Sequence, residues 1–576
     1  MNSARIFPFI AAACISGLAG ARDLDVKLPD IGSSAGAVMS QQDQQSYGAS
    51  VLHELRSYGL VLDDALLDEY LNALGYKLVA NSDRPDLPFT FFIVRDNDIN
   101  AFAVPGGYIA ANAGLIINMS REDELAAVLA HEISHITQQH LLRAFEDMKK
   151  MSLPTMLAML GILIASSHTH DDTGTAAIMT GTSLMQQRQI NFTRHDEAEA
   201  DRVGIQTMAR AGYDPLAMAD TFATLQRIMR VNGVDVPEFL LDHPVDTHRI
   251  ADAKARAQNL TCSRVPAAAA TSTRVAGGGA LNLALPSPRT TEIQSSSGED
   301  DAEALASSES ATVSVDAHGS SPGTLPRVSV TACGVHTAAQ ETYFELMRER
   351  ARVLSSDTPS KVRAYYADNL QRDPSFDTPP NRYGYALALT RSGAAGEAAG
   401  ILRKLVATEP NLAVYRLGLA DALDQSGNKA ESLAVYEQLG TDFPGSRAIS
   451  LSYADALIAR ADVAGARRAQ ELLRPLVERY AGDPDLQKSY ARACQLGGDK
   501  VRAAEAYAEA AYLNGHAEDA LNQLKTLSKE PDLTFYQRSR VDARITELTP
   551  EVLALRKRGT PEPDSPGSLS FTCCRR

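Results

Sequence analysis

The stretch Ala126–His140, AAVLAHEISHITQQH, decides how the rest of the chain is interpreted. Its apolar spacing predicts an α-helix that carries His131 and His135 four residues apart. Residues at positions i and i+4 of a helix lie about 40° apart around the axis and roughly 6 Å apart, so both imidazoles face one side, as two zinc ligands do. Glu132 lies about 100° around the helix from His131, where its carboxylate can reach a water on the open side of a metal.

A catalytic zinc site usually takes a third ligand from the protein and leaves one position for water. The segment RHDEAEADRVG, residues 194–204, offers Glu197 and Asp201 four residues apart on a predicted helix. Glu197 can bind the metal while Asp201 accepts a hydrogen bond from a histidine ring and fixes its tautomer. Glu199 should face elsewhere, and the competing candidates His195 and Asp196 lack this spacing.

Length and charge limit the class of protein. A chain of 576 residues exceeds one comfortable hydrophobic core and should hold two or three domains. The formal net charge of −15 gives electrostatic steering the wrong sign for a polyanion. We therefore expect no nucleic-acid partner.

Residues 1–21 are typical of a cleaved secretory signal peptide, with Arg5, a short apolar core and small residues at 19–21. The alternatives are a buried N-terminal helix and, through Cys14, a lipoprotein signal. A signal peptide favours a periplasmic protein, in an oxidising compartment where a Cys262–Cys333 disulfide is conceivable. The odd number of remaining cysteines leaves the pairing open.

Residues 22–261 are predicted to form the domain that carries HEISH. The segment PFTFFIV, residues 88–94, predicts a strand, and a strand pair is expected around Pro105–Gly107. The resulting small sheet could hold an extended peptide along its edge. Two apolar arms between residues 151 and 187 are each too short to span a bilayer, which predicts a hydrophobic helical hairpin over the active site. The hairpin could serve core packing, or it could act as a lid or a membrane-surface contact.

The remainder divides into an insert, a repeat region and a tail. Residues 262–335 are of low complexity and predict a disordered insert, and residues 550–576 predict a flexible tail. In residues 336–549, Gly393 and Gly427 are 34 residues apart, as are Pro410 and Pro444, and the spacing lengthens near ARADVAGARRAQ. This period resembles that of tetratricopeptide repeats and predicts an α-solenoid with a concave binding face; a plain helical bundle is the alternative.

Taken together, HEISH, EAEADR and DHPVDTHRI resemble the M48 family of zinc metallopeptidases. The resemblance implies a mainly α zincin-type domain with a small sheet, one Zn²⁺ bound by His131, His135 and Glu197, and Glu132 as general base. It also implies that His243 can occupy the fourth position of the metal and hold the enzyme inactive. Arg249 matches the arginine of the family and could stabilise the oxyanion of the tetrahedral intermediate.

With a signal-like start and a repeat tail, the chain resembles periplasmic members of this family. That implies a zinc endopeptidase of outer-membrane protein assembly and quality control, whose partners are the barrel assembly machinery and misassembled outer-membrane proteins. The alternative is a zinc-containing chaperone or adaptor that binds clients through the solenoid without proteolysis. Glu132 argues against it, because a structural zinc site needs no general base. The insert and the tail depart from the family pattern.

Overall fold

The computed structural model describes residues 39–147, 194–232, 239, 243, 247–260 and 333–558. In this part of the chain an N-terminal unit combines a small sheet with helices, and a long series of helices follows. The helices of the N-terminal unit are α1 (Gln41–Ser57), α2 (Ala65–Val79), α3 (Ala113–Asn118), α4 (Glu122–Thr137), α5 (His140–Asp147), α8 (Arg194–Arg210), α9 (Ala217–Asn232) and α11 (Thr247–Asn259). The architecture is mainly α with a small β-sheet, which confirms the predicted fold class.

The sheet has three strands, β1 (Thr90–Val94), β2 (Ala101–Val104) and β3 (Tyr108–Asn112), in the order β1-β3-β2. β1 runs parallel to β3, and β2 runs antiparallel to it. The hairpin between β2 and β3 turns at Gly106 and Gly107, whose φ angles of 90° and 84° suit glycine. A Cβ atom on Gly107 would lie 1.9 Å from the carbonyl oxygen of Pro88, so no larger residue fits this turn.

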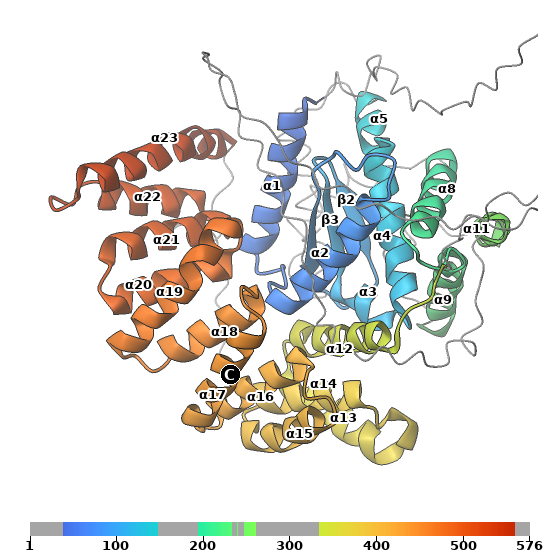
Figure 1. The fold of residues 1–576 in the computed structure, drawn as a ribbon. Coiled ribbons are helices and arrows are strands. Elements are labelled where there is room, and N and C mark those ends of the chain that lie inside the picture. Colours follow the sequence, from blue (N-terminus) through green and yellow to red (C-terminus); the bar gives the residue numbers. More distant parts are fainter. Residues whose placement is uncertain are drawn as a thin grey trace, which may run out of the picture.

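Alternate side chains of the sheet face two layers of helices. Phe91 and Ile93 belong to the core shared with α2 and α4, whereas Phe92 and Val94 pack with residues of α1. Figure 1 accordingly shows the strands between α1 on one side and α2 with α4 on the other. The HEISH helix α4 is therefore enclosed, and nearly all of its residues are buried.

From residue 338 onward the described chain forms paired helices. They are α12 (Ala338–Ser355), α13 (Pro359–Arg372), α14 (Pro379–Arg391), α15 (Ala395–Thr408), α16 (Ala413–Gln425), α17 (Lys429–Asp442), α18 (Arg447–Ile458), α19 (Val463–Arg479), α20 (Pro484–Gly497), α21 (Lys500–Leu513), α22 (Ala517–Leu527) and α23 (Phe535–Arg558). α19 has 17 residues where α15 and α17 have 14, which accounts for part of the lengthened spacing. α23 extends past the predicted end of the repeats at residue 549.

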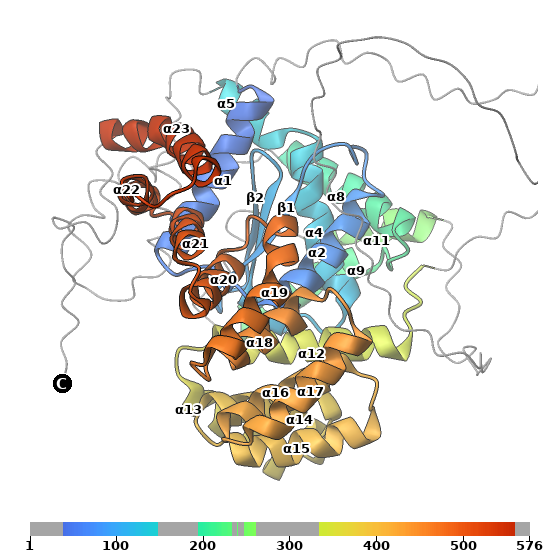
Figure 2. The same ribbon diagram turned by 60° about the vertical axis from the view of Figure 1, so that its left-hand side comes forward.

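The helical array curves along the N-terminal unit, from α12 beneath it to α21–α23 beside α1 (Figures 1 and 2). Two arginines join the units through α2. Arg350 of α12 donates two hydrogen bonds of 2.7 Å to Asp64, the N-cap residue of α2. Arg447 of α18 donates to Asp68 and to the carbonyl oxygen of Ala65, each over 3.1 Å.

Several predicted segments lie outside the described residues: the signal peptide, the apolar hairpin at 151–187, nearly all of the insert and the tail beyond residue 558. Cys333 takes part in a disulfide, and its partner also lies outside them. Among the described residues, no helix combines the length and the apolar character needed to cross a membrane.

Candidate metal centre

Two packed helices carry most of the candidate residues. α4 supplies His131, Glu132 and His135, and α8, which packs along α4, supplies Glu197 and Asp201. Gly204 of α8 allows this close approach, since a Cβ atom there would already lie 3.3 Å from the backbone of Ala130. The i, i+4 spacing in both helices then aims the pairs of side chains at one another.

Four buried side chains converge on one point: His131, His135, Glu197 and His243. The Nε2 atoms of the two α4 histidines are 2.9 Å apart. Glu197 oxygens lie 3.5 Å from each of these nitrogens. The Nδ1 atom of His243 lies 3.0 Å from Glu197 Oε1 and 3.3 Å from His131 Nε2.

These separations suit a tetrahedral zinc ion. Ligands about 2.1 Å from a common centre at tetrahedral angles are roughly 3.4 Å from one another. The five separations range from 2.9 to 3.5 Å. Three imidazoles and one carboxylate also match the donor types that zinc prefers, so the residues fit this metal.

Asp201 and Arg249 lie directly behind the converging side chains. The Nδ1 atom of His131 is 2.9 Å from Asp201, which directs Nε2 of the same ring to the cluster. Arg249 donates from Nε and Nη2 to the two oxygens of Asp201, both over 2.8 Å, and its Nη1 lies 2.9 Å from Glu197 Oε2. The Arg249 guanidinium thus binds both the Glu197 carboxylate, a candidate ligand, and the Asp201 carboxylate, which orients His131.

His243 bridges the cluster and the predicted general base. While its Nδ1 atom faces Glu197, its Nε2 atom lies 3.6 Å from Glu132 Oε1. The ring stacks on buried Phe239 with centroids 4.8 Å apart, and the His243 amide donates to the Phe239 carbonyl over 2.8 Å. The Phe239 amide donates to the carbonyl oxygen of Ile99 over 3.3 Å, which ties Phe239 to the loop before β2.

The electrostatics of the cluster keep Glu197 anionic and His135 neutral. Burial opposes ionisation of Glu197, but His243 and His131 outweigh it and hold the pKa of the carboxyl far below its usual range. Burial and the neighbouring His131 and His243 lower the pKa of His135, so this imidazole is neutral and keeps a lone pair free for a metal. Glu197 therefore supplies negative charge, and His135 supplies a neutral donor.

The structure brings together every residue that the sequence singled out: His131, His135, Glu197, His243, Asp201, Arg249 and Glu132. Their roles in metal binding and catalysis stay predictions. Arg249 contacts carboxylates here, so its predicted contact with an oxyanion is likewise untested. Sequence reasoning did not single out two residues that contact the cluster, Phe239 and His140.

His140 contacts the second histidine of HEISH from behind. Its Nδ1 atom lies 2.9 Å from Nδ1 of His135, and its Nε2 atom lies 3.2 Å from Glu199 Oε2. Glu199, two residues after Glu197 on α8, is directed toward this histidine. The only sequence signal for His140 was its position five residues after His135, which in an unbroken helix would point it elsewhere.

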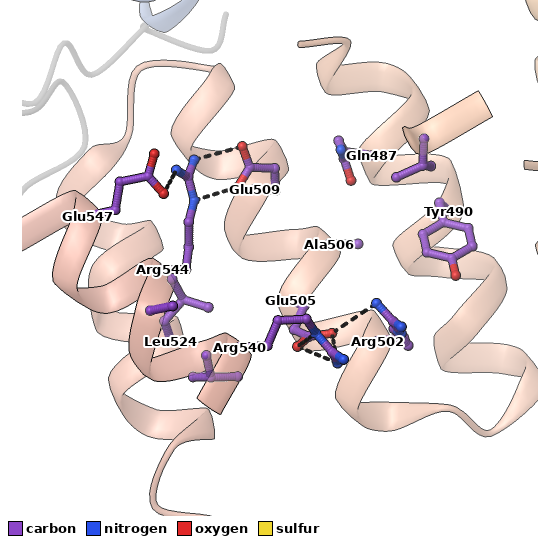
Figure 3. A pocket seen from close by; sticks show the side chains of 13 residues that line it. Gln487, Tyr490, Arg502, Glu505, Ala506, Glu509, Leu524, Arg540, Arg544 and Glu547 are labelled. Carbon is purple, nitrogen blue, oxygen red and sulfur yellow. Dashed lines mark hydrogen bonds and ion pairs between the residues drawn. The ribbon is translucent and has the colours of Figure 1, made fainter. Parts of the chain in front are cut away.

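The solenoid contains a separate pocket of about 380 Å³ between α20, α21, α22 and α23 (Figure 3). Its charged side chains pair with one another: Arg540 with Glu505, and Arg544 with Glu509 and Glu547. Tyr490 adds an aromatic ring to the wall. The pocket is thus balanced in charge, unlike the buried cluster in the N-terminal unit.

Comparison with known proteins agrees with this geometry. Residues 65–257 match the family model for peptidase family M48, and this range includes the whole cluster. The chain is 39% identical over 253 residues to the beta-barrel assembly-enhancing proteases of Yersinia pestis and of Escherichia coli strain K12, a match that covers 44% of this chain and 51% of each relative. It is 29% identical over 148 residues to the mitochondrial metalloendopeptidase OMA1 of Schizosaccharomyces pombe, which covers 26% of this chain and 41% of that protein. The chain thus spans about half the length of the first two relatives.

Proposed function

We propose that this chain is a zinc-dependent endopeptidase of the bacterial envelope that acts in the assembly and quality control of outer-membrane β-barrel proteins. The single observation that carries the proposal is the convergence of His131, His135, Glu197 and His243 beside the buried carboxyl of Glu132. The resemblance of residues 65–257 to M48 peptidases and the names of the relatives support the reaction and the setting.

Each residue of the centre has a distinct task in this proposal. A bound zinc ion would supply Lewis acidity, which acidifies water and polarises the carbonyl of a peptide bond. Glu132 takes up the proton of the attacking water and passes it to the leaving amine. Asp201 fixes the tautomer of His131. Arg249 fixes the positions of the Glu197 and Asp201 carboxylates, from which its guanidinium nitrogens lie 2.9 and 2.8 Å.

We further propose that His243 keeps the resting enzyme inactive. Its Nδ1 atom lies 3.3 Å from His131 Nε2 and 3.0 Å from Glu197 Oε1, where it would occupy the metal position that an attacking water needs. Its ring also lies between that position and Glu132. Release of His243 would free both the water position and the base, which suits an enzyme that must spare correctly assembled neighbours.

Client recognition is assigned to two surfaces. In the described part of the sheet, β2 pairs only with β3, so its other edge can pair with an extended peptide. The solenoid is proposed to dock the assembly machinery or its misassembled clients through its curved face, as in other solenoids. The alternative function, a zinc-containing chaperone or adaptor, would use the same two surfaces without cleavage.

Metal analysis of the purified full chain tests the centre on which this proposal rests. We expect about one zinc ion per chain, and we expect His131→Ala to lose it. His248→Ala is the matched control, because His248 is exposed on α11 and belongs to no cluster described above. A full complement of zinc in His131→Ala would refute the metal centre. Cleavage of a client by the zinc-loaded chain separates the peptidase from the adaptor.

A further inference from the structure

Resting on the proposed zinc centre, we propose that Glu199 and His140 form a hydrogen-bonded relay that fixes the ring of His135 for metal binding. Asp201 performs this task for His131 through a single direct contact of 2.9 Å. For His135, the Glu199 carboxylate acts through the imidazole of His140. The Nδ1 atoms of His135 and His140 are 2.9 Å apart, and His140 Nε2 lies 3.2 Å from Glu199 Oε2. Glu199 and His140 are positioning residues in this scheme, and neither binds the metal.

The positions of the ring nitrogens determine which nitrogen carries a proton in each imidazole of the relay. His135 Nε2 faces the cluster, 2.9 Å from His131 Nε2 and 3.5 Å from Glu197. If this nitrogen offers its lone pair to a metal, the neutral ring carries its proton on Nδ1. His135 Nδ1 then donates to His140 Nδ1, which leaves the His140 proton on Nε2, where it can be donated to Glu199 Oε2.

A break between α4 and α5 brings His140 into contact with His135. α4 ends at Thr137, and Gln139 adopts a φ of 57° before α5 begins at His140. In an unbroken helix, a residue five positions after His135 would lie about 140° around the axis from it. The left-handed backbone conformation of Gln139 redirects the chain, so that His140 lies against His135. A positive φ at a residue other than glycine is unfavourable and is concentrated at functional sites.

The far end of the relay is also fixed. Arg143 Nη2 lies 3.1 Å from Glu199 Oε2, and Arg202 Nη2 lies 3.7 Å from Glu199 Oε1. The His140 ring itself is only 1% exposed, so water cannot take the place of its partners. Carboxylate, imidazole and candidate ligand thus form a continuous chain from the surface of α8 to the cluster.

Zinc affinity of the full-length chain, measured by titration against a competing chelator, tests the relay. Loss of a supporting partner of this kind typically lowers metal affinity 10–100-fold. We expect a loss in this range for His140→Ala and a smaller one for Glu199→Gln, which keeps an acceptor but removes the charge. His140→Gln can accept and donate through its amide and should recover part of the affinity. His195 is an exposed histidine on α8, the helix that carries Glu199. The control variant His195→Ala should therefore bind zinc as the parent does.

Two further measurements keep the outcomes distinct. The visible spectrum of the cobalt-substituted chain should change in both His140→Ala and Glu199→Gln. Thermal unfolding of the metal-free chain should stay near that of the parent in Glu199→Gln, whose side chain is 21% exposed. Parental affinity in both His140→Ala and Glu199→Gln would overturn the relay, and so would a second zinc equivalent that only His140→Ala loses, because it would make His140 a ligand. His131→Ala separates the two hypotheses, since retention of zinc there would refute the proposed metal centre itself.

Discussion

Arg350 and Asp64 form a bidentate ion pair between the solenoid and the N-terminal unit, with both hydrogen bonds at 2.7 Å. The side chains are only 12% and 15% exposed, and Arg350 also donates to Tyr383 over 2.9 Å. Burial opposes ionisation of Asp64, but Arg350 lowers the pKa of this carboxyl below its ordinary value. The contact therefore couples the start of α2, and with it the core around α4, to the repeats.

Arg350→Met should lower the free energy of unfolding by about 3–5 kcal/mol, because it leaves the Asp64 carboxylate buried without its partner. Chemical denaturation of the full chain measures this loss. Arg382 and Asp377 form a matched bidentate pair that is 46% and 37% exposed. Arg382→Met should cost about 1 kcal/mol or less. Equal costs for the two substitutions would show that the Arg350 pair does not join the units.

Gly515 gives a second test of this interface, where the solenoid meets α1. Its φ is 84°, and a Cβ atom would lie 2.3 Å from the carbonyl oxygen of His53. Gly427 has a similar φ of 86° but nothing within 4 Å of a Cβ atom. Gly427→Ala should therefore cost only about 1–2 kcal/mol for its left-handed backbone. Gly515→Ala should cost clearly more and increase proteolytic nicking between the units; equal unfolding midpoints would contradict the close approach.

Phe239 should support the proposed resting state of His243. Phe239→Ala removes the stacking partner at 4.8 Å but leaves every candidate ligand and Glu132 in place. If His243 blocks the site, we expect both His243→Ala and Phe239→Ala to raise the rate of casein hydrolysis, with the larger increase for His243→Ala. Phe376→Ala, in the repeats, serves as an aromatic control and should leave the rate unchanged. Activity at or below the parental rate in His243→Ala would argue against the block.

His53 should make the interface sensitive to acid. Burial, with the charges of Arg56 and Arg544, lowers the pKa of its imidazole to about 4, below the usual value of 6.5. The contribution of the neutral His53 ring to the free energy of unfolding is therefore fully present above pH 6.5. It is lost as the pH falls from 6.5 to about 4. We expect the parent to lose roughly 1–3 kcal/mol more than His53→Gln between pH 7 and pH 4.5. Parallel losses in the two chains would contradict this, and exposed His248→Gln should match the parent.

The predicted residues and the overlooked ones differ in how the chain brings them together. His131, His135, Glu197 and Asp201 were predictable because each pair lies one helical turn apart, so local periodicity alone aims the side chains. The 34-residue period likewise predicted the paired helices. His140 was missed because its orientation depends on the φ of 57° at Gln139, which helical spacing does not reveal. Phe239 and the Arg350–Asp64 pair depend on contacts between distant segments, for which no periodic signal exists.

The general-base role of Glu132 tests the central claim most directly. It should be measured in a His243→Ala background, so that a blocked site cannot mask the effect, with a purified unfolded outer-membrane β-barrel protein as substrate. We predict that Glu132→Gln retains about one zinc ion per chain and the parental unfolding midpoint, yet lowers the rate of cleavage by about 10²–10⁴-fold. Unchanged cleavage in a zinc-loaded, folded Glu132→Gln chain would contradict the assignment of this protein as a zinc endopeptidase.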